Sequence, residues 1–581
     1  MKKYILPILL LLLIFPASGW AATYYMSADG EAANKAAATA CGAVGTTMSV
    51  TVHNGETFSQ GDFIHLCDDG GDYTDELIVP SDGSDGSPIT YKNASGDTPL
   101  FDGTVEFNDF VQVGETEIWC RAQTNSTDLQ QVFEDGDRMI YSADEASMGQ
   151  GSWAADGGEI CVWSSDDGNP NTGHVTEYTD TTSVSNSRMI QFNGKSWITF
   201  DGINVTKANV AAYATYPDDA YNVDIDGTTE TGLIIKNCDV GFTGIRSIVI
   251  GTDTSTNFQY PINVVIQNVV GHDDLDHPFW IGHGTDLVVE YCTAYNSGKD
   301  LDPSVLNYPK AVHYVNGINL SAECVDCILR GNYVYDIYNN ATRGGPAIID
   351  EKSGGLVSSG ALITRNYINQ TGRSAHAMTI QGTNTTVSNN VIVHDAGMGI
   401  ILGTNAPVAP KFYGNTIIST TNNHSLYFGV GSNIELKNNI IYRTGATNRF
   451  ITVFTVAESG FVADNNLYYT TGTPRWFWGP EAETSTFSTW QGYCSGDANG
   501  ISGSDPLLNA DYTLKPGSPA RNAGDTSIDA TRLQPTTTFG VGSNGLTMED
   551  ITIGAYGVYR GSALAMLIEE AEIYEELGKL I

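Results

Sequence analysis

The sequence predicts an all-β solenoid, a chain wound into stacked coils of short parallel strands. A phrase with a central Asn recurs between residues 230 and 470, as in ILRGNYV, VSNNVIV and LKNNIIY. The last four intervals between these Asn residues are 24, 25, 24 and 27 residues long, which fits one coil each. The apolar segments around each Asn are too short for the 3.6-residue periodicity of a helical repeat.

The recurring Asn defines a column through the coils. The aligned positions are Asn237, Asn268, Tyr291, Asn332, Asn366, Asn390, Asn415, Asn439 and Asn466. Strands in neighbouring coils stack about 4.8 Å apart, so amide side chains at one corner can hydrogen-bond up the stack and satisfy buried backbone groups. We therefore interpret this column as structural.

The N-terminus predicts export. Lys2 and Lys3 precede an apolar run over residues 4–15, and small residues follow as far as Ala22. This is the pattern of a signal peptide, with cleavage expected after Ala21 or Ala22. The run of about 12 residues is shorter than the roughly 20 that span a bilayer. We expect a secreted, extracellular or cell-surface protein, or a periplasmic one, with an uncleaved N-terminal anchor as the alternative.

Charge and cysteine content narrow the class further. The chain has 67 acidic and 28 basic residues and a net charge of −39, so nucleic acid is excluded as an expected partner. A local basic site or bound Ca²⁺ could still hold an acidic sugar. Export permits disulfides, and Cys41–Cys67 and Cys120–Cys161 are plausible pairs because each lies within one segment. The Cys-x-x-Cys pair that begins at Cys324 suits a local disulfide or two packed thiols.

The repeats resemble the PbH1 coils of secreted proteins of the pectate-lyase-like superfamily. Residues 61–103 resemble their opening coil, 505–526 and 553–557 their closing segment, and 132–170 a β-sandwich-like insertion found in several of these hydrolases and lyases. The resemblance implies a right-handed parallel β-helix solenoid with an inserted β-rich unit. The resemblance does not indicate which reaction the chain catalyses, because this fold is shared by lyases, hydrolases, epimerases and non-catalytic adhesins.

The expected organisation has six parts. They are a signal peptide (1–22), an N-terminal cap with the first coils (23–105), the inserted β-rich unit (106–195), the β-helix core (196–475), C-terminal coils with a closing segment (476–560) and a short C-terminal helix (561–581). The apolar face of that helix is expected to cover the open end of the solenoid, where an unpaired strand edge would otherwise invite association. A partner-binding or attachment helix is the alternative.

A polar column lies four positions after the Asn. It contains His272, Tyr295, Asp336, Gln370, His394, Ser419 and Arg443. We expect these residues to lie just past a strand, on the outer face of the solenoid. There they would offer repeated hydrogen-bond partners to a sugar chain. An ordinary solvated turn is the alternative.

A second column comes from another strand of each coil. Aligning WIGHG, INLSA, IIDEK and TIQG groups His283, Asp350, Glu351, Lys352 and Gln381, with His313 and Asn319 nearby. Carboxylates and a lysine supply acid, base or Ca²⁺-ligand roles. Two carboxylates could flank a glycosidic bond for hydrolysis, or the lysine could remove the proton α to a uronate carboxyl group. A solvated turn with an ion pair is the alternative.

The segment IIDEKS resembles the strand that carries the catalytic lysine of chondroitinase-like and alginate-lyase-like β-helix enzymes, which implies that role for Lys352. Two features depart from that pattern. The expected Ca²⁺-binding glutamates would fall at Gly345 and Ala347, and the expected arginine near Gln381. Arg373, the nearest candidate, belongs to a different part of the coil, so the mechanism is not transferred.

The segment GHDDLDHPFWIGHG (271–284) is rich in His and Asp, which suit a metal, and holds a Trp that could stack on a sugar. The candidate catalytic residues are therefore Asp350, Glu351, Lys352, His313 and His394. The candidate substrate-binding residues are His272, Trp280, His283, Asp336, Gln370, Arg373, His376, Gln381 and Asp395, and the candidate metal ligands, with Ca²⁺ as the ion considered, are Asp273, Asp274 and Asp276.

Two functions follow from this reading. The leading one is a carbohydrate-active protein that cleaves an extracellular polysaccharide as a lyase or a glycoside hydrolase. The other is a non-catalytic glycan-binding or adhesive surface protein. The sugar, the linkage and the oligomeric state stay open.

Overall fold

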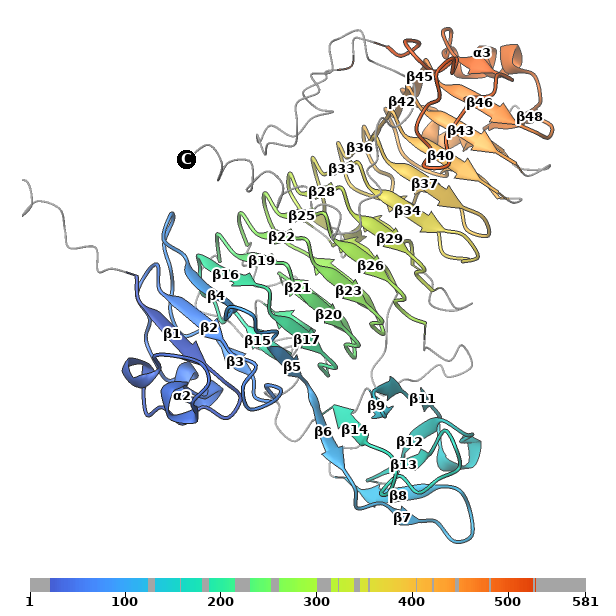
Figure 1. The fold of residues 1–581 in the computed structure, drawn as a ribbon. Coiled ribbons are helices and arrows are strands. Elements are labelled where there is room, and N and C mark those ends of the chain that lie inside the picture. Colours follow the sequence, from blue (N-terminus) through green and yellow to red (C-terminus); the bar gives the residue numbers. More distant parts are fainter. Residues whose placement is uncertain are drawn as a thin grey trace, which may run out of the picture.

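The computed structural model is a long β-solenoid (Figure 1). It describes residues 21–123, 131–156, 158–179, 188–209, 211–214, 230–251, 261–299, 315–321, 323–338, 345–353, 356–403, 405–420, 423–444, 449–479, 482–525 and 528. Nearly all of the expected signal peptide and the whole of the expected C-terminal helix lie outside these ranges. Within them, no helix is long and apolar enough to cross a membrane.

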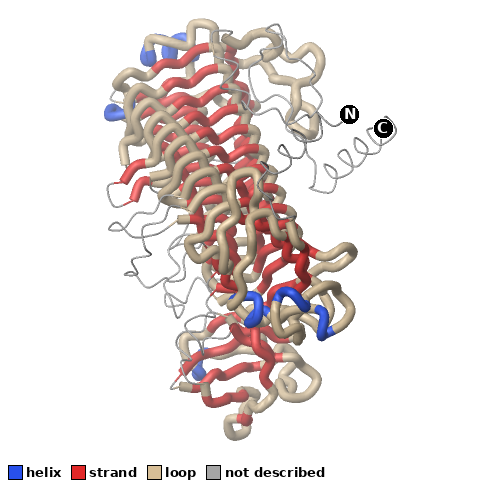
Figure 2. The backbone as a smooth tube through the Cα atoms, turned by 90° about the vertical axis from the view of Figure 1, so that its left-hand side faces the viewer, coloured by secondary structure: helices blue, strands red, loops and turns tan. Residues whose placement is uncertain are grey.

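Three long sheets, named A, B and C, run along the solenoid, and Figure 2 shows their strands stacked coil on coil. Sheet A contains β1 (Thr23–Met26), β2 (Phe63–Leu66), β4 (Ile89–Asn93), β16 (Ile198–Asp201), β19 (Ile234–Lys236), β22 (Val265–Gln267), β25 (Val288–Glu290), β28 (Ile328–Arg330), β33 (Leu362–Thr364), β36 (Thr386–Ser388), β39 (Lys411–Tyr413), β42 (Glu435–Lys437) and β45 (Val462–Asp464).

Sheet B follows sheet A in each coil. It contains β5 (Leu100–Asp102), β17 (Asn204–Thr206), β20 (Asp239–Gly241), β23 (Val270–His272), β26 (Thr293–Tyr295), β29 (Tyr333–Tyr335), β34 (Tyr367–Gln370), β37 (Val391–His394), β40 (Thr416–Ser419), β43 (Ile440–Arg443), β46 (Leu467–Thr470) and β49 (Ile501–Ser502).

Sheet C completes the coil. It contains β3 (Leu77–Ile78), β15 (Arg188–Gln191), β18 (Ala211–Ala214), β21 (Arg246–Ile250), β24 (His277–Ile281), β27 (Ile318–Leu320), β30 (Ile348–Asp350), β35 (Met378–Ile380), β38 (Ile400–Leu402), β41 (Leu426–Phe428), β44 (Ile451–Val453), β47 (Trp476–Trp478) and β48 (Ala482–Thr484). All pairs in the three sheets are parallel except β47 with β48. A small hairpin of β31 (Lys352–Ser353) and β32 (Leu356–Val357) projects from one turn.

The core is the inside of the solenoid. Each coil places one apolar residue of sheet A directly over its neighbour, as in the paired and buried residues Val289, Leu329, Ile363 and Val387. A single coil has nothing to bury these side chains against, so the coils are stable only as a stack. This confirms the all-β parallel solenoid predicted from the repeat.

The Asn column forms the corner between sheets A and B in six coils. Each side-chain amide donates to the Oδ1 of the next Asn, with distances from 2.9 to 3.0 Å for Asn332, Asn366, Asn390, Asn415 and Asn439. Asn466 ends the ladder by donating to Asp497 Oδ1 at 3.3 Å. The structural interpretation of these six residues is confirmed.

The sequence alignment of the first three coils is wrong by one residue. Strand pairing places Val240, Gly271 and Ala294 in the row of Val334. Cys238 and Cys292 therefore hold the ladder position, while Asn237 and Asn268 occupy the preceding left-handed position, with φ of 57° and 51°. A one-residue slip moves a side chain to the opposite face of a strand.

Two small sheets project from the side of the solenoid near its N-terminal end (Figure 1). Their strands are β6 (Thr104–Phe107), β7 (Val111–Gln112), β8 (Trp119–Ala122), β9 (Val132–Glu134), β10 (Asp137–Arg138), β11 (Ile140–Tyr141), β12 (Ser152–Asp156), β13 (Glu159–Trp163) and β14 (Thr176–Thr179). They contact the solenoid through Lys207, whose Nζ lies 2.6 Å from Glu177 Oε2. β15 already belongs to sheet C.

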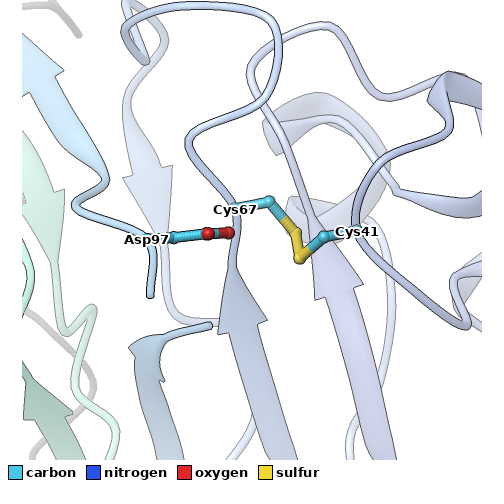
Figure 3. Close-up of side chains that lie close together, drawn as sticks. All are labelled: Cys41, Cys67 and Asp97. Atoms are coloured by element: carbon cyan, nitrogen blue, oxygen red, sulfur yellow. A yellow bond between two sulfur atoms is a disulfide. The ribbon is translucent and has the colours of Figure 1, made fainter. Parts of the chain in front are cut away.

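Short helices and disulfides complete the structure. Helix α2 (Val50–Asn54) and helix α3 (Phe487–Cys494) lie at opposite ends of the solenoid, and 3-10 turns cover Lys35–Ala37, Val44–Thr46, Glu145–Ser147 and Thr455–Ala457. The two expected pairs, Cys41–Cys67 and Cys120–Cys161, are disulfides. Figure 3 shows the first of them beside Asp97. Cys324 and Cys327 are buried free thiols.

Candidate functional site

The outer face of sheet C brings the second predicted column together. Strand pairing sets Trp280, Asn319, Ile349 and Thr379 in one outward row. The next row is inward and contains Ile281, Leu320, Asp350 and Ile380. Glu351 and Gln381 come directly after Asp350 and Ile380, so they return to the outer face at the edge of the sheet.

Asp350 is not available to a substrate. Its side chain is 0% exposed and lies in the core, where it accepts a hydrogen bond from Thr385 Oγ1 at 2.5 Å. Burial raises the pKa of this carboxyl group above its usual value, against hydrogen bonds from Thr385, Ser358 and Gly382 that lower it. The assignment of Asp350 as a catalytic residue is therefore wrong, because the alternation of the strand turns it inward.

Glu351, Lys352 and Gln381 form a cluster with Asn319 and Asn405, which we name the sheet C cluster. Asn319 Nδ2 donates to Glu351 Oε2 at 3.1 Å. Gln381 Oε1 accepts from the Lys352 backbone N–H at 3.0 Å and from Asn405 Nδ2 at 2.7 Å. Glu351, Lys352 and Gln381 are half-buried. The Glu351 carboxylate, the Gln381 amide and the Lys352 backbone are thus each fixed by a neighbour, while part of each residue stays in contact with solvent.

Asn319 also has an unused acceptor. Its side chain is 3% exposed, and its Oδ1 has no hydrogen-bond partner. The same is true of Asn316 Oδ1, three residues earlier, in a side chain that is 2% exposed. A buried acceptor without a donor costs about 1–3 kcal/mol. Both oxygens are enclosed by the protein, so neither faces a ligand at the surface.

His283 and Trp280 lie at the N-terminal side of this cluster. His283 Nδ1 lies 3.3 Å from Glu323 Oε2, and Glu323 and Glu351 follow successive strands at the same edge of sheet C. Trp280 is 2% exposed, with the Arg246 guanidinium 4.8 Å from its ring centroid. The indole face is therefore occupied, which removes Trp280 as an open stacking surface.

The three aspartates predicted as metal ligands each interact with different side chains. Asp273 accepts from His272 Nδ1 at 2.8 Å, and Asp274 from Thr243 and Ser247 hydroxyls at 2.6 and 2.9 Å. Asp276 lies 3.5 Å from Arg246 Nε and 3.1 Å from His277 Nδ1.

Across the described ranges, three or more potential ligand side chains come together only at Cys41, Cys67 and Asp97 and at Cys120, Glu145 and Cys161. Both groups contain a disulfide, which Figure 3 shows for Cys41 and Cys67, so their sulfur atoms are not thiolates. The set of Asp273, Asp274 and Asp276 is therefore wrong as one metal site.

The first predicted polar column does not form a groove. Gln370 and His394 are 0% exposed, inside the corner between sheets B and C, as are Ser419 and Arg443. Burial lowers the pKa of His394 to about 4. The assignments of His394 as catalytic and of Gln370 as substrate-binding are wrong, because strand β34 and strand β37 turn these side chains inward.

His272 belongs to the outer face of sheet B. Its two ring nitrogens lie 2.8 Å from Asp239 Oδ1 and Asp273 Oδ2. Burial lowers the pKa of this imidazole, but the hydrogen bonds to the two aspartates outweigh it and raise the pKa to about 9. A histidine held charged between two carboxylates is a structural ion pair rather than a proton shuttle near neutral pH.

The remaining predicted residues lie in the turns between sheets B and C. Arg373 Nε donates to Asp336 Oδ1 at 3.0 Å, and Asp395 Oδ2 accepts from the Gly372 backbone N–H at 2.7 Å. His376 Nδ1 accepts from the Met398 backbone N–H at 3.1 Å, and burial lowers its pKa. His313 lies outside the described residues.

Sequence reasoning missed Asn405 and an aromatic group further along sheet C, formed by Tyr427, Phe454 and Phe477. The register of sheet C shows where they lie relative to the outward row. Thr379, Ile401, Tyr427, Thr452 and Phe477 continue the outward row of Asn319.

Comparisons with known proteins identify no relative by sequence: no family model and no curated protein matches the chain. Among solved structures, XylC in complex with xylose matches with a TM-score of 0.59 and 13% identity, over 84% of this chain and 87% of that one. The A-module of mannuronan C-5 epimerase AlgE6 from Azotobacter vinelandii matches with a TM-score of 0.40 and 11% identity, over 77% and 90% of the two chains. Pectate lyase Pel9A matches with a TM-score of 0.38 and 13% identity, over 92% and 96%.

The XylC similarity covers most of both chains and, at this identity, shows the fold alone. Together with the three long parallel sheets, it identifies the class: the chain is a right-handed parallel β-helix protein.

Proposed function

We propose that this chain is an exported carbohydrate-active protein that binds a polysaccharide across the outer face of sheet C and cleaves it at the sheet C cluster. The observation that carries the proposal is the contact of Glu351 and Lys352 with the amides of Asn319, Gln381 and Asn405. It places the Glu351 carboxylate beside a side-chain amide at the edge of sheet C, with Lys352 directly after it and bonded to Gln381 and Asn405 through its backbone N–H and carbonyl. The fold similarity to XylC, whose structure holds xylose, supports a sugar ligand.

Two reactions suit these groups. In β-elimination, Lys352 would remove the proton α to a uronate carboxyl group, and bound Ca²⁺ or a cationic side chain would offset the charge that develops. In hydrolysis, Glu351 and Glu323 would act at the glycosidic bond from successive turns of the same sheet edge.

A non-catalytic glycan-binding protein is the second candidate. The burial of Asp350 favours it, because the residue pair Asp350–Glu351 then offers the substrate one carboxylate instead of two. The polar row of sheet C would serve binding equally well.

The test is incubation of the purified mature chain with xylan, β-glucan, polygalacturonate and alginate, with and without Ca²⁺. Products that absorb in the ultraviolet indicate elimination, and new reducing ends without that absorbance indicate hydrolysis. If the reaction is elimination, we expect Lys352→Ala to lower kcat by about 10²- to 10⁴-fold, the usual size of a general acid–base contribution. If it is hydrolysis, we expect the same loss from Glu351→Gln.

Two matched variants control this test. Asp350→Asn changes the neighbouring carboxyl group that faces the core, and Lys236→Ala removes a lysine on sheet A that is paired with Asp201 at 3.1 Å. Both should keep the wild-type rate. Binding without any product would leave the second candidate, and full activity in the Glu351 and Lys352 variants would refute the sheet C cluster as the reaction site.

A further inference from the structure

The outer face of sheet C carries a second surface beyond the sheet C cluster. Its rings come from Tyr427 in β41, Phe454 just after β44 and Phe477 in β47, and we name them the aromatic surface. Tyr427 and Phe454 lie 5.4 Å apart between ring centroids with planes 58° apart, and Phe454 and Phe477 lie 5.6 Å apart at 52°. The rings contact each other at a tilt and are not stacked face to face.

This geometry differs from the aromatic ladder of sheet B. There, His272, Tyr295 and Tyr335 stack with interplanar angles of 12° and 5°, so each ring covers the face of the next. The tilt in the aromatic surface leaves ring faces partly uncovered, and Phe454 is 36% exposed. Tyr427 and Phe477, which contact Phe454, are half-buried. Aromatic side chains that touch one another at the surface are candidates for ligand contact, whereas scattered ones need no explanation.

Two guanidinium groups border the aromatic surface. Arg449 lies with its guanidinium carbon 4.8 Å from the Phe477 ring centroid, and its Nε donates to Glu483 Oε2 at 2.6 Å. Arg475 donates to the other oxygen of Glu483 at 2.9 Å. These two guanidinium groups share one carboxylate, which leaves a local positive charge in a chain whose net charge is −39. Each guanidinium has five N–H donors, so donors remain for a ligand oxygen.

The aromatic surface is continuous with the sheet C cluster. The outward row runs from Thr379 through Ile401 to Tyr427, one strand at a time. Three strand steps separate β30 from β41, which at about 4.8 Å per step is roughly 14 Å. One extended chain lying across the strands would therefore reach both places.

We propose that the aromatic surface is a binding site for sugar rings of a polysaccharide chain, at a distance from the point of cleavage. The apolar face of a sugar ring would pack on Phe454, which is supported from behind by Phe477 with Arg449 against its ring. The hydroxyl or carboxylate oxygens of the sugar would accept hydrogen bonds from Arg449 and Arg475. This rests on the proposed function for the identity of the chain that is bound. Its consequence is a preference for long chains over short fragments.

The experiment is native gel electrophoresis of the full mature chain with xylan, β-glucan, polygalacturonate or alginate in the gel, beside assays of the same polymers and their trimers. We expect retardation of the wild type by at least one polymer. In Phe454→Ala combined with Phe477→Ala, we expect about tenfold weaker retardation and a raised KM for that polymer, with turnover of the trimer unchanged. Retardation by the neutral or the uronate polymers distinguishes hydroxyl from carboxylate recognition at the arginines.

The matched control is Tyr333→Ala, which removes a ring that is 38% exposed on the outer face of sheet B. It should bind as the wild type does. Equal retardation of the double variant and the wild type would overturn the proposal, as would absence of retardation by all four polymers. In either of these cases, cleavage by the wild type would leave the proposed reaction standing. Weaker retardation of the double variant, in a protein that cleaves none of the polymers, would support the aromatic surface and refute the reaction.

Discussion

Two corners of the same solenoid bury polar side chains in different ways. Between sheets A and B, one residue type repeats, and each Asn from Asn332 to Asn439 donates to the Asn of the next coil at 2.9–3.0 Å. Between sheets B and C, four different side chains, Gln370, His394, Ser419 and Arg443, fill the equivalent buried row. In that row, Gln370 Nε2 and His394 Nε2 have no hydrogen-bond partner.

The difference shows what a repeated residue contributes. An amide has one acceptor and two donor hydrogens, so a column of identical amides satisfies itself and the backbone beside it. In a row of different side chains, the donors and acceptors of neighbouring coils do not match in this way. A buried polar group that stays unpaired then destabilises the protein. The uniform corner should therefore stabilise the fold, and the mixed corner should be where stability depends on pH.

The largest effect is expected from Asn390→Ala in the middle of the ladder. The substitution removes the acceptor of the Asn366 backbone N–H, at 2.9 Å, and the donor to the Ile363 carbonyl, also at 2.9 Å. Each of these two buried groups, left unsatisfied, costs about 1–3 kcal/mol, so we expect a loss of roughly 2–6 kcal/mol in the free energy of unfolding. Urea unfolding followed by circular dichroism measures it.

Asn509→Ala, at an exposed turn, is the control for that substitution and should change the unfolding free energy by less than about 0.5 kcal/mol. Equal losses in the two variants would contradict the view that the ladder supports the A–B corner.

The mixed corner should lose stability in acid through His394. Its folded-state pKa is lowered to about 4, from an ordinary value near 6.5, because burial disfavours the charged imidazolium. As the pH falls below 6.5, the unfolded chain takes up the proton first, and stability is lost until the folded state also protonates near pH 4. The loss approaches about 3 kcal/mol.

His394→Gln, which introduces the residue that Gln370 already provides one coil earlier, should flatten this part of the profile. Melting temperatures at pH 7.5, 6.0 and 4.5 measure it. A slope unchanged by the substitution would assign the acid sensitivity elsewhere, for example to His53, whose pKa burial also lowers to about 4.

Asp350, at the remaining corner between sheets C and A, should act in the opposite direction with a smaller effect. Burial raises its folded-state pKa, so the protonated form is favoured in the folded protein. The stability that this gives is present at low pH and is lost as the pH rises through the folded-state pKa. Asp350→Asn should therefore be more stable than the wild type at pH 7, and the gain should be smaller at pH 4. Urea unfolding midpoints of both proteins at pH 4 and pH 7 measure this. A variant that is less stable at pH 7 than the wild type would show that the ionised carboxylate is needed.

The same contrast explains which parts of the molecule the sequence predicts. The Asn column and its apolar neighbours recur at nearly constant spacing, so the coils and the role of Asn390 follow from the repeat alone. Asp350 and Glu351 are adjacent carboxylic acids at the end of strand β30. Only the strand pairing shows that Asp350 faces the core and Glu351 the outer side. The aromatic surface is invisible without the register, because the motif of these coils surrounds Asn439 and Asn466 and does not extend to Phe454 and Phe477.

The smallest effect tests whether the ladder can be lengthened. Cys292 holds the ladder position one coil before Asn332, and its backbone N–H already donates to Asn332 Oδ1 at 2.9 Å. Its thiol contacts the Ile266 carbonyl at 3.6 Å, which corresponds to the Val289 carbonyl that Asn332 Nδ2 reaches at 2.9 Å. In Cys292→Asn, the new amide would meet donors and acceptors placed as in the six existing rungs. We expect a gain of about 1 kcal/mol in the free energy of unfolding, the net value of a typical buried hydrogen bond, where Cys292→Ser should give none. A loss of stability in Cys292→Asn would mean that the first coils are too narrow for an amide at this corner, and that their departure from the Asn repeat is a requirement of packing.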